Sequence, residues 1–137
     1  MKLVDVYPSM PYTLLYTLLE ERTPEQSISH KKQPTFPEHI AFVDSLPYKH
    51  WYLIREDDWL GAIYINEVEY PQETIREVGI SLFNKYRGKG YGTEALKMLM
   101  ERHPGNLYAN INPDNYPSKM FFTEKFGAKL IQQTYAL

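Results

Sequence analysis

Three glycines at alternate positions stand directly before a helical pattern, in the stretch "KYRGKGYGTEALKMLM". Gly88, Gly90 and Gly92 are separated by single residues, and the cations Arg87 and Lys89 lie beside them. A glycine cluster marks an unusual backbone shape or the close approach of a ligand. Because the free N–H groups and the dipole of a helix N-terminus attract anions, this arrangement predicts a site for a phosphate group.

Two common glycine-loop signatures do not account for this stretch. A Walker A loop requires G-x-x-x-x-G-K-[ST], and neither the glycine spacing nor the Lys-Ser/Thr pair is present. A dinucleotide fingerprint requires G-x-G-x-x-G and follows the first strand of a βαβ unit. Counted from Gly88, the last glycine of that fingerprint is replaced by Thr93, and the loop follows a meander of strands. The phosphate must therefore belong to another kind of ligand.

The composition limits the possible partners and the compartment. The chain has 137 residues, a formal net charge of −2 and no cysteine. A nucleic-acid partner is not expected because such partners require a basic surface, and the lack of cysteine excludes disulfides and thiolate-based metal sites. The N-terminus "MKLVDVYPSM" lacks the apolar core of a signal peptide, and no apolar run reaches the ~18 residues that span a bilayer. We expect a cytoplasmic protein with no membrane partner and no metal.

The helices and strands that position the glycine loop can be predicted from the spacing of apolar residues and from turn-forming residues. Thr35 and Glu38 have the spacing of a capping box, and Asp57-Asp58 marks a tight turn between two strands. The order of elements predicts one domain, 1–137, in which a meander of strands precedes a crossover helix. Strands are predicted at 2–7, 50–56, 59–69, 75–83, 106–112 and 128–137, and helices around 14–19, 35–47, 90–103 and 115–127.

Two motifs in this order resemble the GNAT superfamily of N-acetyltransferases. Residues 87–92, "RGKGYG", match the pattern R/Q-x-x-G-x-G/A between a strand and a helix. "NPDNYPSKMFFTEKFGA" is similar to the second signature, roughly N-x-x-S-x-x-F/L-Y-x-K-x-G-F. The resemblance covers residues 75–130, and the N-terminal half only through the order of its elements. It implies an α/β (α+β) fold with a mixed, mostly antiparallel six-stranded sheet, about four helices, and acetyl-CoA as co-substrate.

The resemblance also implies where acetyl-CoA binds. The loop N–H groups of 88–93 would face the pyrophosphate, and the strand before the loop would pair with the amide-bearing pantetheine arm. The thioester would lie where the sheet splays between 75–83 and 106–112. The implied cofactor-binding residues are Ile80, Ser81, Leu82, Arg87, Gly88, Lys89, Gly90, Tyr91, Gly92, Thr93, Asn115, Ser118 and Phe122. Alternatively, Asn115 and Ser118 could serve only to cap a helix. The glycine loop could likewise be a connection without a ligand.

Acetyl transfer to an amine requires a base, and in the resembled family this is often a glutamate on a central strand. Glu77 lies on the strand that leads into the cofactor site, so it is the first candidate; an exposed strand glutamate is the alternative. His30, in the polar loop "SISH", is the second candidate for catalysis or acceptor binding. His39 is expected on a helix surface and His50 at a strand start. Asn110 stands where some family members carry a glutamate.

The family's frequent acid, a tyrosine in the second signature, is missing. Counted from Ser118 the tyrosine position is Phe122, and counted back from Gly127 it is Thr123, because the segment is one residue longer. A donor for the departing thiolate is then supplied by another group. The open alternatives are Tyr91, Tyr116, Tyr135 and water.

These observations predict an N-acetyltransferase that moves the acetyl group of acetyl-CoA to a primary amine of a small molecule, with an amino sugar as one candidate. The missing tyrosine keeps a catalytically weak acyl-CoA-binding module open. Protein or peptide amines are a further alternative acceptor, and a non-enzymatic domain with a structural glycine loop is the third reading. The oligomeric state is expected to be monomer or homodimer.

Overall fold

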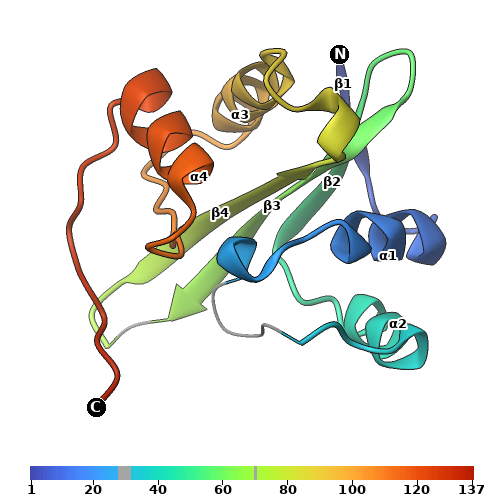
Figure 1. The fold of residues 1–137 in the computed structure, drawn as a ribbon, viewed down its shortest axis with the longest axis horizontal. Helices are drawn as coiled ribbons and strands as arrows, with labels where there is room; N and C mark the ends of the chain where they lie inside the picture. Colours follow the sequence, from blue (N-terminus) through green and yellow to red (C-terminus); the bar gives the residue numbers. More distant parts are fainter. Residues whose placement is uncertain (28–31, 70) are drawn as a thin grey trace.

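One antiparallel sheet forms the centre of the molecule. The structure is a computed structural model that describes residues 1–27, 32–69 and 71–137. Within these residues four strands pair in the order β1-β2-β3-β4 (Figure 1). Their bounds are Lys2–Asp5 for β1, His50–Arg55 for β2, Trp59–Glu69 for β3 and Thr74–Leu82 for β4. The predicted turn between β2 and β3 is present, with Trp59 N donating to Asp58 Oδ1 at 2.9 Å.

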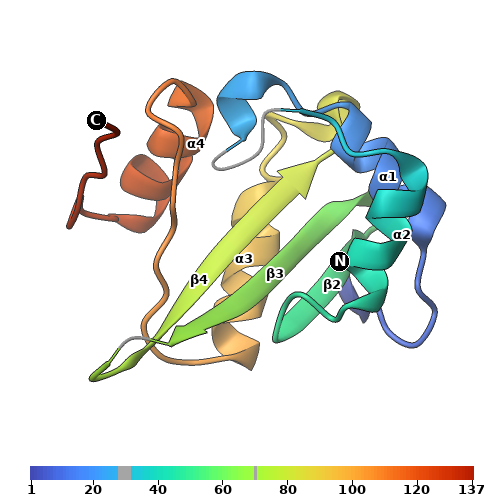
Figure 2. The ribbon, with the colours of Figure 1, turned by 90° about the horizontal axis from the view of Figure 1, so that it is seen from below.

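Helices cover both faces of this sheet. Helices α1 (Tyr12–Glu20) and α2 (Phe36–Asp44) lie on one face, and α3 (Tyr91–Arg102) lies on the other (Figures 1 and 2). Helix α4 (Tyr116–Met120) continues as a π-helix, Phe121–Lys125, and lies beside β4 on the side away from β3. The α/β (α+β) class and the four expected helices are confirmed.

The alternation of side chains along β3 builds a separate core on each face. Ile63 and Ile65 are fully buried against Leu96 and Leu99 of α3. Ala62, on the opposite face of β3, belongs to the cluster that α1 and α2 close, whose other members are Val6, Leu15, Val43, Trp51 and Leu53. The sheet thus lies between two apolar layers, one on each face.

The sheet has four strands in the described residues, so the expectation of six is wrong. In the described residues, the backbone of segment 106–112 bonds to the backbone of β4 only at Tyr108, which donates to Arg76 O at 2.9 Å and accepts from Val78 N at 2.8 Å. Beyond this point the buried Asn112 donates through Nδ2 to Ser27 O at 2.8 Å. This tertiary contact holds the segment against the 24–27 turn, away from the edge of β4.

The strand predicted at 128–137 is also absent. Its apolar side chains are exposed, with Leu130 and Ile131 at 76% and 72% exposure. The one backbone hydrogen bond that ties this tail to the helix before it runs from Ala128 N to Phe122 O, at 3.0 Å. The residue types favour a strand, but a strand requires a paired neighbour, and no described strand pairs with this tail.

His39 was expected on a helix surface and is instead buried between α1 and α2. Only 4% of the residue is exposed, and its Nε2 lies 3.2 Å from Tyr12 O. The rings of Tyr16 and Phe36 pack against the imidazole. Burial lowers the pKa of His39, so the ring is held neutral and donates to the carbonyl.

Candidate active site

The start of α3 is an uncapped helix N-terminus. Its N-cap is Gly90, with φ of 86°, and no side chain caps the helix. Gly88 also has positive φ, at 72°. The first helical hydrogen bond runs from Glu94 N to Gly90 O, so the N–H groups of 91–93 have no partner within the helix. Free donors and the dipole of a helix start attract anions, so this geometry is compatible with the predicted phosphate site.

The side chains of the loop divide into exposed charges and packed rings. Lys89 is exposed beside the helix start. Arg87 donates through Nε to Leu82 O at 3.2 Å, so at least one of its donors holds the loop to the end of β4. Tyr91 packs edge-on against Tyr86, with ring centroids 6.3 Å apart. Thr93, in the first turn of α3, is half-buried.

The far edge of β4 is open beside this helix start. Val78 N bonds outward to Tyr108 and Phe83 N bonds inward to Leu60 O of β3, so residues of even number turn their backbone groups to the outer edge. The N–H and C=O of Ile80 therefore face the gap that the splay opens. The backbone of Ser81 faces β3 instead. Leu82 turns to the outer edge like Ile80, but its carbonyl oxygen already accepts from Arg87 Nε at 3.2 Å. Of the three predicted strand contacts, Ile80 is therefore the one whose outward C=O receives no competing hydrogen bond from the described residues.

Helix α4 closes the other side of the gap. Asn115 is its N-cap and accepts from Ser118 N at 3.2 Å, which leaves its amide nitrogen as the atom that can donate to a ligand. A Cβ on Gly92 would meet the ring of Phe121 at 3.5 Å, so this ring faces the start of α3. Phe122 contacts Phe121 edge-on, with ring centroids 5.0 Å apart, and is buried in the α3-side core at 7% exposure.

The π-helix explains why the second motif is one residue too long. A π-helix inserts one extra residue into a helix, and such insertions are frequent at functional sites. Here the insertion covers Phe121–Lys125 and places Phe121, and not Phe122 or Thr123, toward the helix start. The Thr123 hydroxyl donates to Lys119 O at 2.8 Å within the helix.

Glu77 lies at the apex of the splay, on the α1/α2 face of β4. It is half-buried, and its Oε1 accepts a hydrogen bond from Asn110 Nδ2 across the point where the two segments diverge. Asn110 therefore positions this carboxylate. The bridge between Glu77 and Tyr108 fixes the backbone at the same level. Glu77 is thus a positioned carboxylate at the point where the two segments diverge.

Two phenols that were not predicted as site residues lie on this face: Tyr64 lies near Glu77, and Tyr48 packs on Tyr64. Tyr64 of β3 pairs with Gly79 of β4, and a Cβ on Gly79 would overlap the Cζ and hydroxyl oxygen of Tyr64. The ring of Tyr48 stacks on that of Tyr64, with centroids 3.7 Å apart and planes 5° apart. The only sequence signal was Gly79 itself, since a lone glycine in a strand indicates the close approach of another group.

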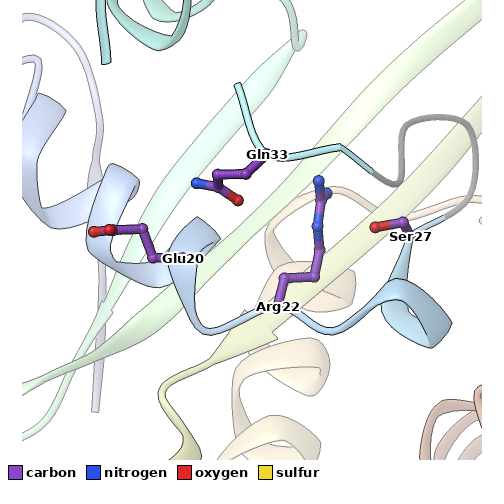
Figure 3. Close-up of a pocket in the computed structure, with 4 residues that line it drawn as sticks. All are labelled: Glu20, Arg22, Ser27 and Gln33. Atoms are coloured by element: carbon purple, nitrogen blue, oxygen red, sulfur yellow. The ribbon is translucent and has the colours of Figure 1, made fainter. Parts of the chain in front are cut away.

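A polar pocket opens on the same face of the sheet (Figure 3). Its volume is about 240 Å³, and it is lined by Glu20, Arg22, Ser27 and Gln33. In Figure 3 Arg22 reaches between Gln33 and Ser27, over the sheet. The positive charge of Arg22 also acts to lower the pKa of both Tyr48 and Tyr64, so the pocket and the phenol pair are neighbours.

The second predicted catalytic residue, His30, lies outside the described residues. His50 is at the start of β2, as expected, where it stacks on His103 at 3.9 Å between centroids. No group of three or more His, Asp or Glu side chains in the described part of the chain is arranged to hold a metal ion. Nor is any described helix long and apolar enough to cross a membrane.

The family model of the acetyltransferase (GNAT) domain matches residues 20–129 of this chain. This match covers most of the sequence, and the chain belongs to the GNAT acetyltransferase family. Members of this family are acyltransferases that use acetyl-CoA. No curated protein sequence gives a significant match to the chain.

Solved structures with the same fold include three acetyltransferases of low sequence identity. An acetyltransferase from Thermus thermophilus is 20% identical, with a TM-score of 0.71 over 91% of this chain and 84% of its own. The aminoglycoside antibiotic 6'-N-acetyltransferase of Acinetobacter haemolyticus, in its apo form, is 12% identical, with a TM-score of 0.72 over 100% and 97% of the two chains. A protein from Clostridium acetobutylicum, described as a predicted acetyltransferase with acetyl-CoA, is 13% identical, with a TM-score of 0.67 over 99% and 93%.

Proposed function

We propose that residues 1–137 form one N-acetyltransferase domain that moves the acetyl group of acetyl-CoA to the primary amine of a small polar molecule. The observation that carries this proposal is the uncapped start of α3 beside the open edge of β4. The first supplies N–H donors for a pyrophosphate, and the second supplies backbone groups for the amide-bearing arm of the cofactor.

The residues present fit acetyl-CoA at this site. Nothing described lies within 4 Å of a Cβ on Gly88 or Gly90, so the loop backbone is open to a ligand. Lys89 adds an exposed positive charge, Ile80 offers its backbone, and the amide of Asn115 lies on the far side of the gap. Phe122 is not among the contacts that this arrangement favours, because its ring is buried in the core.

The acceptor side of the proposal rests on Glu77 and on the pocket near Arg22. Glu77 takes the proton from the acceptor ammonium, directly or through water, so that the nitrogen can attack the thioester carbonyl. The four residues that line the pocket are all polar, which favours an acceptor rich in hydrogen-bonding groups. An amino sugar has this character. The Acinetobacter structure is named for aminoglycosides, so these compounds head the panel to be tested.

Two measurements on the purified chain test the proposal. Isothermal titration calorimetry with acetyl-CoA should show binding, and thiol release should appear when amino sugars and aminoglycosides are added. Polyamines and lysine-containing peptides test the alternative acceptors. Binding without thiol release from any amine would favour the catalytically weak acyl-CoA-binding module. A chain that binds no acetyl-CoA would contradict the proposal and leave the glycine loop as a structural connection.

We predict that Lys89→Glu weakens acetyl-CoA binding while the fold is kept. Lys89 is exposed, so reversing its charge disturbs no core packing. The expected loss is about 3- to 10-fold in Kd at low salt, shrinking as salt screens the charges. Lys97→Glu is the matched control, because Lys97 is exposed on the same helix but away from its N-terminus. Equal Kd values for the two variants would show that the loop does not face the pyrophosphate.

A further inference from the structure

Tyr64 extends its phenol across β4 toward the open edge. Residues 64 and 79 are directly paired, and Gly79 has no side chain, so the ring of Tyr64 occupies the space above its backbone. The hydroxyl end of the ring is the part that lies over Gly79. The next residue, Ile80, turns its N–H and C=O to the gap. The phenol therefore ends beside the stretch of β4 next to the splay, where the resemblance to GNAT enzymes places the thioester.

The surroundings of this phenol keep it protonated. Burial is the main cause that raises the pKa of Tyr64, and the negative charge of Glu77 raises it further. Tyr48 stacks on its ring, with centroids 3.7 Å apart, and shields it further from solvent. A phenol whose pKa is raised is protonated near neutral pH and can donate a proton.

The other candidate phenols lie in less suitable places. Tyr116 is 67% exposed at the start of α4, next to Lys119. Tyr135 is 77% exposed in the C-terminal tail and donates to Gln133. Tyr91 packs against Tyr86 at the start of α3, at the phosphate end of the proposed site. None of the three lies next to Glu77.

We propose that the Tyr64 hydroxyl is the proton donor to the sulfur of coenzyme A during acetyl transfer, an assignment that rests on the proposed function. The amine nitrogen bonds to the thioester carbonyl carbon, the C–S bond breaks, and the sulfur leaves with the electron pair. The Tyr64 proton moves to this sulfur. Of the two protons that the ammonium loses through Glu77, one is released and one returns from solvent to the Tyr64 oxygen. Ammonium and acetyl-CoA thus give the amide, the free thiol and one proton.

Tyr64→Phe tests this proposal, because it keeps the ring over Gly79 and the stack on Tyr48 while it removes the hydroxyl. We expect kcat to fall by about 10- to 10²-fold, with the KM for the amine and the calorimetric Kd for acetyl-CoA unchanged. Tyr48→Phe is the matched control and should lower kcat by less than about threefold, since it removes the second hydroxyl of the same stack. Gly79→Ala is a second variant: its Cβ displaces the phenol, and it should lower kcat to a similar extent as Tyr64→Phe.

Each result has a defined meaning. A Tyr64→Phe variant that folds and keeps its kcat overturns the assignment. So does a variant in which only the KM for the amine rises, because the phenol then binds the acceptor and donates no proton to the thiolate. If the parent chain binds no acetyl-CoA, or binds it and acetylates no amine, the proposed function fails first and the role of Tyr64 fails with it. Thermal unfolding of both phenylalanine variants separates loss of fold from loss of chemistry.

Discussion

At the scale of single residues, the proposed chemistry depends on how Glu77 is held. Its carboxylate lies at the apex of the splay, and Asn110 donates to one of its oxygens from the diverging segment. The other carboxylate oxygen, Oε2, is the atom that would take a proton from the acceptor. Tyr64 lies on the same face of the sheet, so an acceptor amine above β4 would lie near both groups.

We predict that Glu77→Gln lowers turnover by about 10²-fold or more, with little change in acetyl-CoA affinity. Glutamine keeps an oxygen that can accept from Asn110, so the local structure is preserved while the base is lost. Steady-state kinetics of thiol release measures turnover, and calorimetry measures acetyl-CoA affinity. Glu67→Gln, an exposed position on β3, is the control. An unchanged turnover in Glu77→Gln would exclude Glu77 as the base and direct attention to His30.

Part of this candidate site could be proposed from the sequence. The glycine loop stands out because glycines directly before a helix form a local pattern, and Glu77 became a candidate base through the resemblance to the GNAT superfamily. Tyr64 was not recognised, because its importance comes from the cross-strand pairing with Gly79 and from Tyr48, which is 16 residues away in the chain. Such contacts become visible only once the register of β3 and β4 is known.

At the scale of elements, α4 and its π-helix determine which aromatic ring faces the cofactor gap. The extra residue rotates the helix so that Phe121 faces the start of α3 and Phe122 enters the core. A hydroxyl at position 122 would thus be buried among apolar side chains and would not reach the thioester.

We therefore predict that Phe122→Tyr destabilises the fold by about 1–3 kcal/mol, the cost of a buried hydroxyl without a partner, and gives no gain in rate. Phe121→Tyr is the matched control, because Phe121 is only half-buried and its stability cost should be smaller. Denaturant unfolding and thiol release measure the two effects. A faster Phe122→Tyr variant of unchanged stability would mean that the ring faces the gap after all.

The elements that could be predicted from sequence are those with local signals. The capping box of Thr35 and Glu38 is present at the start of α2, and the glycines before α3 mark its start. The two missed strands, 106–112 and 128–137, have strand-forming residue types but depend on a neighbouring edge. The contact between Asn112 and Ser27 that pulls the first of them away joins residues 85 positions apart, which no local pattern reveals.

At the scale of the whole molecule, two histidines make stability depend on pH near neutrality. Burial is the main cause that lowers the pKa of both His39, between α1 and α2, and His103, after α3. Each ring is thus held neutral in the folded protein, while in the unfolded chain a histidine gains its proton at about pH 6.5. The unfolded state therefore binds more protons below that pH, and the free energy of unfolding should fall as the pH drops from about 7 toward the lowered pKa values.

We predict that His39→Gln reduces this pH dependence. The side-chain amide of glutamine can still donate to Tyr12 O but takes no proton, so the slope of unfolding free energy against pH between about 5.5 and 7.5 should become smaller. Glu38 and Asp58 also have lowered pKa values, but their hydrogen bonds are lost only as the pH falls through the carboxylate range near 4 and below, outside this window. Urea unfolding at half-unit pH steps gives the slope directly. If the parent and the variant have equal slopes, the buried ring of His39 does not contribute, and the remaining dependence belongs to His103, which His103→Gln would then remove.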